Sequence, residues 1–146
     1  MLDYAGGIEE AAAYYHAKWG RPGNLPFFLD AIRHSSSGVT GLPRFYLALA
    51  NDEIVGCCGL IANDFISRHD LQPWLCGLFV EERERGRALG NALMHHVEQD
   101  AKTAGYTTVF LTTDHDGYYE RYGWVRMEDG HDPSGAATRI YRKALS

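Results

Sequence analysis

The run RGRALG, residues 85–90, combines two arginines with two glycines and one alanine. Backbone N–H groups in the first turn of a helix have no intrahelical partner and together carry about half a positive charge. They bind anions where small side chains let a ligand approach the backbone, and arginines add cationic charge. If a helix begins here, the run suits a pyrophosphate. For so short a motif, a solvated turn between a strand and a helix is an equally weighted alternative.

The sequence contains neither of the two common nucleotide-binding loops that would compete with this interpretation. It has no GxxxxGK[ST] run, and RGRALG lacks the glycine spacing of GxGxxG. A pyrophosphate turn of another kind is therefore the functional hypothesis for residues 85–90.

Other titratable residues are interpreted structurally. Asp114, His115 and Asp116 share one turn and could form a metal site or a proton relay, but we favour capping of a short helix by Asp114 or Asp116. His95 and His96 lie in a predicted long helix without further ligands at neighbouring positions, so we expect solvated or packed side chains.

The three cysteines are predicted to be reduced thiols of the core. Cys57 and Cys58 are adjacent in a predicted strand and must point to opposite faces, and Cys76 belongs to another strand. No CxxC spacing of a zinc site occurs. We therefore expect no metal.

Apolar periodicity and turn residues predict a mixed chain of helices and strands. In chain order we expect helices at 8–18 and 24–34, strands at 45–50, 54–62 and 74–80, a helix at 88–104, a strand at 107–113, a short helix at 118–123, and strands at 124–127 and 137–144. Asn24 is a plausible N-cap, and Asn51 with Asp52 forms a hairpin turn. Strand, helix and strand over 74–113 form a βαβ unit whose strands should be parallel.

The bulk properties predict one domain over residues 1–146, because 146 residues with 45% hydrophobic content form one core. The net charge of −5 argues against general binding to nucleic acid or anionic membranes. No apolar run could span a bilayer, and the N-terminus lacks a signal sequence, so we expect a cytoplasmic protein. Exposed strand edges at the C-terminus could pair in a homodimer.

Two blocks of sequence resemble the GNAT N-acetyltransferase superfamily. LFVEERERGRALGNAL is similar to the family's [QR]xxGx[GA] segment, with Arg85 at its first position, Ala88 at its usual first glycine and Gly90 at its last. LTTDHDGYYERYGW is similar to the family's strand followed by FYxxxGF. The resemblance is specific over about residues 44–128, and the family's first strand would have to be LDY at 2–4.

The resemblance implies an α/β (α+β) fold with a mixed, twisted central sheet of about six or seven strands, flanked by about four helices. It also implies acetyl-CoA as a co-substrate. The residues that would bind it are Leu78, Phe79, Val80, Arg85, Gly86, Arg87, Ala88, Leu89, Gly90, Asn91 and Tyr119. In the family, backbone groups of the strand at 78–80 contact the pantetheine and the acetyl carbonyl, and N–H groups there would stabilise an oxyanion. Apart from the resemblance, 78–80 reads as a buried strand.

Catalytic residues follow from the same resemblance. Tyr119 aligns with the family tyrosine that serves as the acid for the leaving thiolate, although on its own it would be interpreted as a core aromatic. Asp64 is the candidate general base, with Glu81, Glu82 or a chain of water molecules as alternatives. The family often has asparagine just after the strand at 107–113, where this chain has Asp114.

The sequence thus predicts an acetyl-CoA-dependent N-acetyltransferase that acetylates a primary amine by direct attack in a ternary complex. The acidic balance favours a cationic small molecule or a peptide amine as the acceptor. A non-catalytic CoA-binding sensor or regulatory module is the alternative, and transfer of a longer acyl group is a third interpretation that depends on the pocket beside Cys76 and Phe79.

Overall fold

A computed structural model describes residues 2–36, 41–86 and 88–146. The elements are α1 (Ile8–Trp19), α2 (Leu25–Arg33), β1 (Arg44–Ala50), β2 (Glu53–Ile61), β3 (Trp74–Val80), the 3₁₀ helix η1 (Glu82–Glu84), α3 (Leu89–Thr103), β4 (Thr108–Thr113), the 3₁₀ helix η2 (Tyr119–Tyr122), β5 (Val125–Arg126), β6 (Gly130–His131) and β7 (Ala137–Ala144). The predicted mixed class is confirmed. Among the described residues there are three α-helices rather than about four, and two further helices are short 3₁₀ turns.

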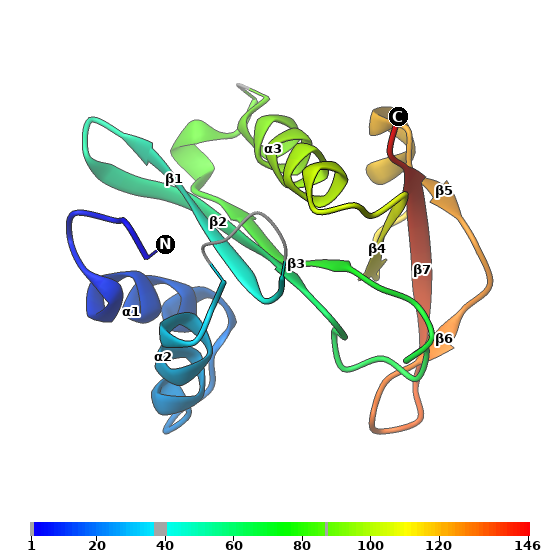
Figure 1. Cartoon of the computed structure of the whole chain (residues 1–146), viewed down its shortest axis with the longest axis horizontal. Helices are drawn as coiled ribbons and strands as arrows, with labels where there is room; N and C mark the ends of the chain where they lie inside the picture. The colour runs from blue at the N-terminus through cyan, green and yellow to red at the C-terminus, as the bar shows by residue number, and fades with distance from the viewer. Residues whose placement is uncertain (1, 37–40, 87) are drawn as a thin grey trace.

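The sheet consists of two antiparallel halves joined by one parallel contact. Its strand order is β1-β2-β3-β4-β7-β5, with β6 paired to β7 outside this path. β3 and β4 are parallel, as the βαβ prediction requires, and their pairing is Trp74 with Phe110. In Figure 1, α3 connects these two strands. β6 has two residues without apolar alternation, which is why the sequence pattern missed it.

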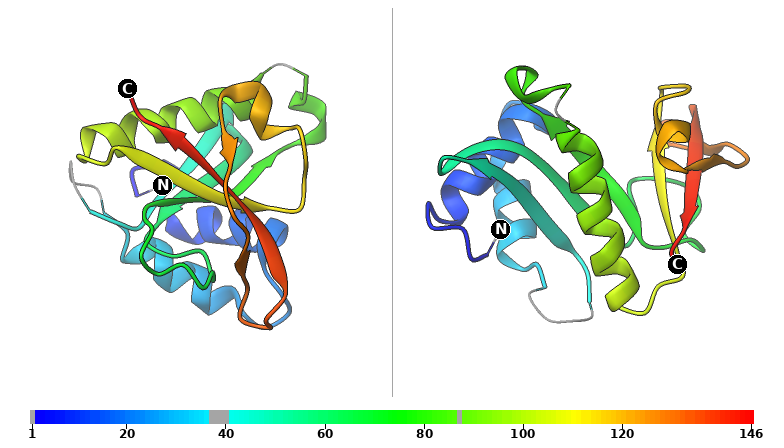
Figure 2. Two further views of the ribbon diagram at one scale, coloured as in Figure 1. Left: turned by 90° about the vertical axis from the view of Figure 1, so that its right-hand side faces the viewer. Right: turned by 90° about the horizontal axis from the view of Figure 1, so that it is seen from above.

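Helices cover both faces of the β1–β3 half, as Figure 2 shows from above: α1 and α2 lie on one face and α3 on the other. Cys57 packs with the α1 and α2 side chains, whereas Cys58 packs with the apolar stripe of α3. The predicted opposition of these two cysteines is confirmed, and both are free and buried. The spacing of Leu93, Val97 and Ala101 places them on the buried face of α3.

Local turns follow the sequence in one case and depart from it in two. Asn51 and Asp52 have φ angles of 52° and 65°, as a two-residue hairpin turn of type I′ requires. Asn24 does not cap α2 with its side chain, because its Oδ1 accepts a hydrogen bond from the Arg21 N–H. Residues 2–4 form turns rather than the family's first strand, so β1 is an edge of the sheet.

A bulge in β3 distorts its pairing with β2. The register shifts between Cys57 and Gly59 of β2, opposite Gly77, whose φ is +58°. The Gly77 carbonyl accepts a hydrogen bond from Trp19 Nε1 at 2.9 Å. A Cβ atom at Gly77 would lie 1.7 Å from the hydroxyl oxygen of buried Tyr15. The bulge therefore needs glycine, and α1 fixes it from one face of the sheet.

Within the described chain no helix is both long and apolar enough to cross a bilayer.

Gly77→Ala should destabilise the fold by about 2–4 kcal/mol, because a left-handed alanine costs about 1 kcal/mol and overpacking against Tyr15 adds about 1–3. Gly135→Ala is the matched control, since Gly135 has a φ of +90° and open space around it. It should lose only about 1 kcal/mol. Urea unfolding measures both losses, and equal losses would contradict the packing role of Gly77.

Candidate active site

Two cavities of about 690 Å³ each meet at Leu78, His115 and Tyr119. The first, here called the turn cavity, lies along the end of β3 and the start of α3 and is lined by Leu78, Phe79, Val80, Arg85, Gly86, Ala88, Leu89, Gly90, Asn91, His115, Tyr118, Tyr119, Arg121 and Tyr122. It brings together all the residues predicted to bind the cofactor except Arg87, which lies outside the described residues. Their binding role stays a prediction.

The turn that opens α3 has an unusual backbone. Gly86 and Ala88 have φ angles of 84° and 58°, and helix α3 begins directly afterwards, with no side-chain cap at Ala88. Where the family pattern has glycine, Ala88 adopts a left-handed conformation that costs about 1 kcal/mol. The alanine is therefore not a neutral replacement. The N–H groups at the start of α3 have no side-chain cap, and residues 88–91 line the turn cavity, so these groups are potential hydrogen-bond donors to an anion there.

Side chains on either side of the turn fix its position. Arg85 Nε donates a hydrogen bond to the Val80 carbonyl at 3.0 Å, and the guanidinium lies 5.6 Å from the Phe79 ring centroid. Gly90 lets the Tyr118 side chain, just before η2, approach α3, because a Cβ there would lie 3.0 Å from the Tyr118 hydroxyl oxygen. The glycine thus serves helix packing as well as access to the backbone.

β3 and β4 separate immediately after the Trp74–Phe110 pair, although both strands continue. Beyond this pair, β3 residues line both cavities. Parallel strands that part in this way leave main-chain N–H and C=O groups without strand partners on their facing edges. A ligand lying between the strands could take up those hydrogen bonds.

Tyr119 lies where the two cavities meet. Burial, together with neighbouring Tyr118, raises its pKa to about 12, and a hydrogen bond with Thr113 opposes the rise. Its ring contacts those of Tyr118 and Tyr141, with centroid distances of 4.9 and 6.0 Å. The phenol therefore stays protonated near neutral pH and can donate a hydrogen bond.

Asp64 lines the second cavity, here called the aromatic cavity, which is bordered by α1, α2, β1, β3 and the loop after β2. Burial raises the pKa of its carboxyl group to about 6. Within the described chain no side chain forms an ion pair or hydrogen bond with Asp64. The carboxylate is thus ionised at neutral pH, and its pKa lies close enough to neutral pH for it to accept a proton there, as a general base must.

The alternative bases lie elsewhere. Glu81 accepts a hydrogen bond from the Tyr14 hydroxyl at 2.8 Å and pairs with Lys18 at 2.9 Å. Lys18 and Tyr14 lower its pKa. Neither Glu81 nor Glu82 borders either cavity, whereas Asp64 lines the aromatic cavity. The role of Asp64 as the base stays a prediction.

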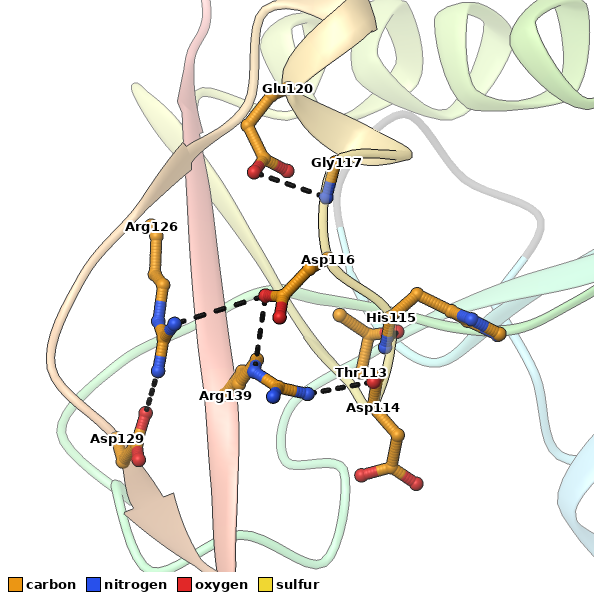
Figure 3. Close-up of polar contacts among 9 residues, drawn as sticks. All are labelled: Thr113, Asp114, His115, Asp116, Gly117, Glu120, Arg126, Asp129 and Arg139. Carbon is orange, nitrogen blue, oxygen red and sulfur yellow. Dashed lines mark hydrogen bonds and ion pairs between the residues drawn. The ribbon is translucent and has the colours of Figure 1, made fainter.

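Arg139 of β7 orders the loop between β4 and η2, as Figure 3 shows. Its guanidinium donates to the Asp114 carbonyl at 2.7 Å and pairs with the Asp116 carboxylate at 3.2 Å. Arg126 adds a second ion pair to Asp116 at 3.8 Å. The predicted capping of η2 by Asp114 or Asp116 is wrong, because no side chain caps this helix and Asp116 is held by the two arginines instead.

His115 projects from the same loop. Its backbone N–H donates a hydrogen bond to Thr113 Oγ1 at 3.0 Å. In Figure 3 its ring points away from Arg126 and Arg139. The loop presents His115 where the two cavities meet.

No group of three His, Cys, Asp or Glu side chains among the described residues is arranged to hold a metal ion.

Comparison with known proteins identifies the family. A sequence model described as "Acetyltransferase (GNAT) family" matches residues 8–124, which include both blocks singled out above. The chain belongs to the GNAT acetyltransferase family. The predicted superfamily and the enzyme class, acyltransferase, are thereby confirmed, and the match also reaches back to α1, outside the range of about 44–128 over which the resemblance is specific.

Solved structures share the fold of this GNAT protein. An aminoglycoside 6′-N-acetyltransferase complexed with coenzyme A has a TM-score of 0.72 at 16% identity, covering 95% of this chain and 91% of its own. An aminoglycoside 6′-acetyltransferase type Ii has 0.70 at 17%, covering 95% and 90%. A GNAT acetyltransferase from Elizabethkingia anophelis with acetyl-CoA bound has 0.61 at 17%, covering 90% and 88%. None of the curated protein sequences matches this chain significantly.

Sequence reasoning missed the N-terminal side of this GNAT site. Tyr15 and Trp19 of α1 and Phe27 and Phe28 of α2 line the aromatic cavity. The resemblance began only at about residue 44, so it could not assign them. A signal was present, because two short helices carrying this many aromatic side chains cannot bury them all without a partner.

Asp64→Asn should make stability less dependent on pH. The folded-state pKa of about 6 exceeds the ordinary 3.8. The folded protein therefore binds more protons than the unfolded chain between these values, and wild-type stability falls as pH rises through them. Replacement by asparagine removes this loss. The free energy of unfolding of the variant, relative to that of wild type, should therefore rise by on the order of 2 kcal/mol as the pH is raised from about 4.5 to about 8.

Urea unfolding at the two pH values measures this gain. Asp70→Asn is the control, because Arg68 lowers the Asp70 pKa below its ordinary value, so Asp70 is ionised at both pH values and its replacement should leave the difference in stability between them nearly unchanged. A gain for Asp64→Asn that is the same at both pH values would contradict the raised pKa.

Proposed function

We propose that this protein is an acetyl-CoA-dependent N-acetyltransferase that transfers the acetyl group to a primary amine by direct attack in a ternary complex. One observation carries the proposal: two cavities of similar volume meet at Tyr119 and Leu78, where β3 and β4 have parted. One cavity suits the cofactor and the other the acceptor. Two of the structural neighbours contain bound coenzyme A or acetyl-CoA, which supports this assignment.

The cofactor would occupy the turn cavity. Backbone N–H groups at the start of α3 would bind the diphosphate, with the exposed guanidinium of Arg85 nearby. The pantetheine amides would pair with the free edge of β3 between Leu78 and Val80. This arrangement places the thioester at the meeting point of the cavities, where a strand N–H can stabilise the oxyanion of the tetrahedral intermediate.

The acceptor amine would enter from the aromatic cavity. A lysine-like ammonium with a pKa near 10.4 is only about 0.1% neutral near pH 7.4, so it must lose a proton before attack. The ionised Asp64 carboxylate would accept that proton. The amine nitrogen then bonds to the acetyl carbon, and the carbon–sulfur bond breaks to release the CoA thiolate.

Tyr119 would stabilise the departing sulfur. Its pKa of about 12 lies above that of a free thiol, about 8.5. The phenol would therefore donate a hydrogen bond to the thiolate rather than lose its proton outright. The nitrogen loses its second proton as the amide forms, and this proton reaches the thiolate through solvent. The proton taken up by Asp64 is released to bulk solvent, which closes the cycle.

Tyr119→Phe should lower kcat by about 100-fold, because the leaving thiolate loses its hydrogen-bond donor. Acetyl-CoA affinity measured by calorimetry should change little, since the ring remains. Release of free thiol from acetyl-CoA with a panel of primary amines measures kcat, and Tyr106→Phe, a tyrosine that borders neither cavity, is the control.

The same assay tests the function itself. Acetyl-CoA binding without amine-dependent thiol release in the wild type would overturn the enzymatic proposal in favour of a CoA-binding sensor. Undiminished kcat in Tyr119→Phe would remove that residue from the mechanism.

Asp64→Asn should abolish the rise of kcat/KM through about pH 6 that the wild type should show. Below that value the carboxyl is protonated and cannot act as a base. A pH–rate profile from pH 5 to pH 9, a range of about two units either side of neutral, measures this. An unchanged profile would dismiss Asp64 and leave a chain of water molecules as the base.

A further inference from the structure

The wall of the aromatic cavity contains six phenylalanine, tyrosine and tryptophan rings in addition to Tyr119. They come from four parts of the chain, and are Tyr15, Trp19, Phe27, Phe28, Phe45 and Phe65. Consecutive rings contact one another at centroid distances from 5.3 to 6.2 Å, in the pairs Phe27–Phe28 and Phe27–Phe65. With the pairs Tyr15–Phe28 and Tyr15–Phe45, at 5.6 and 5.7 Å, five of the six rings form a continuous apolar surface along the wall of the cavity.

Charge in this cavity is sparse and of one sign. Among the described lining residues, Asp64 and Asp114 are the acidic side chains, and neither lysine nor arginine is present. Asp64 has no cationic partner within the described chain, as shown above. An anionic acceptor would meet no lysine or arginine among the described lining residues, whereas one ammonium group would neutralise the buried carboxylate and lie against aromatic faces.

The rim of the cavity keeps two rings in solvent. Phe27 is 55% exposed and Phe65 is 62% exposed. Phe65 also has a φ of 52°, a left-handed conformation that is unusual for a bulky residue. The Asn63 side chain fixes this turn through two hydrogen bonds with the Ile66 backbone, at 2.9 and 3.2 Å. The loop therefore holds an exposed aromatic ring next to Asp64 at a conformational cost.

We propose that the acceptor is a small monoamine with a flat, apolar body, whose ammonium lies at Asp64 and whose body lies between the rings at the rim. This inference rests on the acetyl transfer proposed above and adds the substrate class. It separates this protein from the aminoglycoside acetyltransferases whose fold it shares. A polycationic, polyhydroxylated acceptor would bury hydroxyl and ammonium groups against the phenylalanine rings of the rim, which offer no hydrogen bonds, at a cost for each group.

Steady-state kinetics with three amines tests the substrate class: 2-phenylethylamine, ethylamine as the same amine without a ring, and kanamycin as a polycation. The value of kcat/KM should be about 100-fold higher for 2-phenylethylamine than for ethylamine, because the ring leaves water. It should exceed that for kanamycin as well. A preference for kanamycin, or equal values for the first two amines, would overturn the inference while acetyl transfer stands.

Two rim variants locate the effect. Phe27→Ala and Phe65→Gly should each lower kcat/KM for 2-phenylethylamine by about 10-fold and leave ethylamine within about twofold. Glycine keeps the backbone conformation of residue 65 without strain. Leu49→Ala is the control, since Leu49 is 49% exposed and lies outside the cavity. Equal losses for both amines would contradict a role of the rim in recognition.

Calorimetry separates this inference from the function on which it rests. If no amine is acetylated, titration of 2-phenylethylamine and ethylamine into CoA-saturated protein still tests whether the aromatic cavity binds the ring of the amine. Tighter binding of 2-phenylethylamine, weakened in Phe27→Ala, supports the aromatic site even if the enzymatic proposal fails. Absence of binding for both amines would contradict the inference directly.

Discussion

The separation of β3 from β4 after a single residue pair is the constraint on which the rest of the site depends. A parallel pair normally continues its hydrogen bonds along both strands, and buried main-chain groups without partners are costly. Here α3 packs on one face of β3, and α1 holds the Gly77 bulge from the other face. The two halves of the sheet are therefore kept apart by packing, and the cavities open along the exposed strand edges.

Burial raises the pKa of both titratable groups beside this opening, Tyr119 and Asp64, but the chemical consequence differs between them. It favours the neutral form of each. For Tyr119 the neutral form is the hydrogen-bond donor, and a pKa of about 12 preserves it throughout the physiological range. For Asp64 the raised pKa of about 6 leaves the carboxyl group ionised at neutral pH. It also makes the carboxylate a stronger base than one with an ordinary pKa. One environment thus provides a donor and a base.

The loop that carries His115 and leads to Tyr119 depends on residues remote in sequence. Arg139 comes from β7, beyond the region that the family model matches, yet it holds both the Asp114 carbonyl and the Asp116 carboxylate. Such ion pairs at an exposed surface contribute little stability on average. Their consequence here is geometric, because they fix the path of the chain from β4 to η2.

The sequence was sufficient wherever a local pattern decides the structure. The apolar spacing in α3 and the small residues of RGRALG identified the long helix and the turn before it, and the Asn51–Asp52 turn set the hairpin. It was insufficient where distant segments compete for the same polar group. Asp116 is held by two arginines instead of capping η2, and Asn24 binds the Arg21 N–H instead of its own helix. The α1 and α2 wall of the aromatic cavity was missed for a related reason, since only tertiary packing brings its rings together.

The most direct measurement is a crystal structure of this protein with acetyl-CoA. The account predicts that the diphosphate oxygens lie within about 3 Å of backbone nitrogens at the start of α3. The thioester carbonyl should lie between Leu78 and the Tyr119 hydroxyl. A nucleotide bound away from this turn, or a thioester outside the gap between β3 and β4, would contradict it.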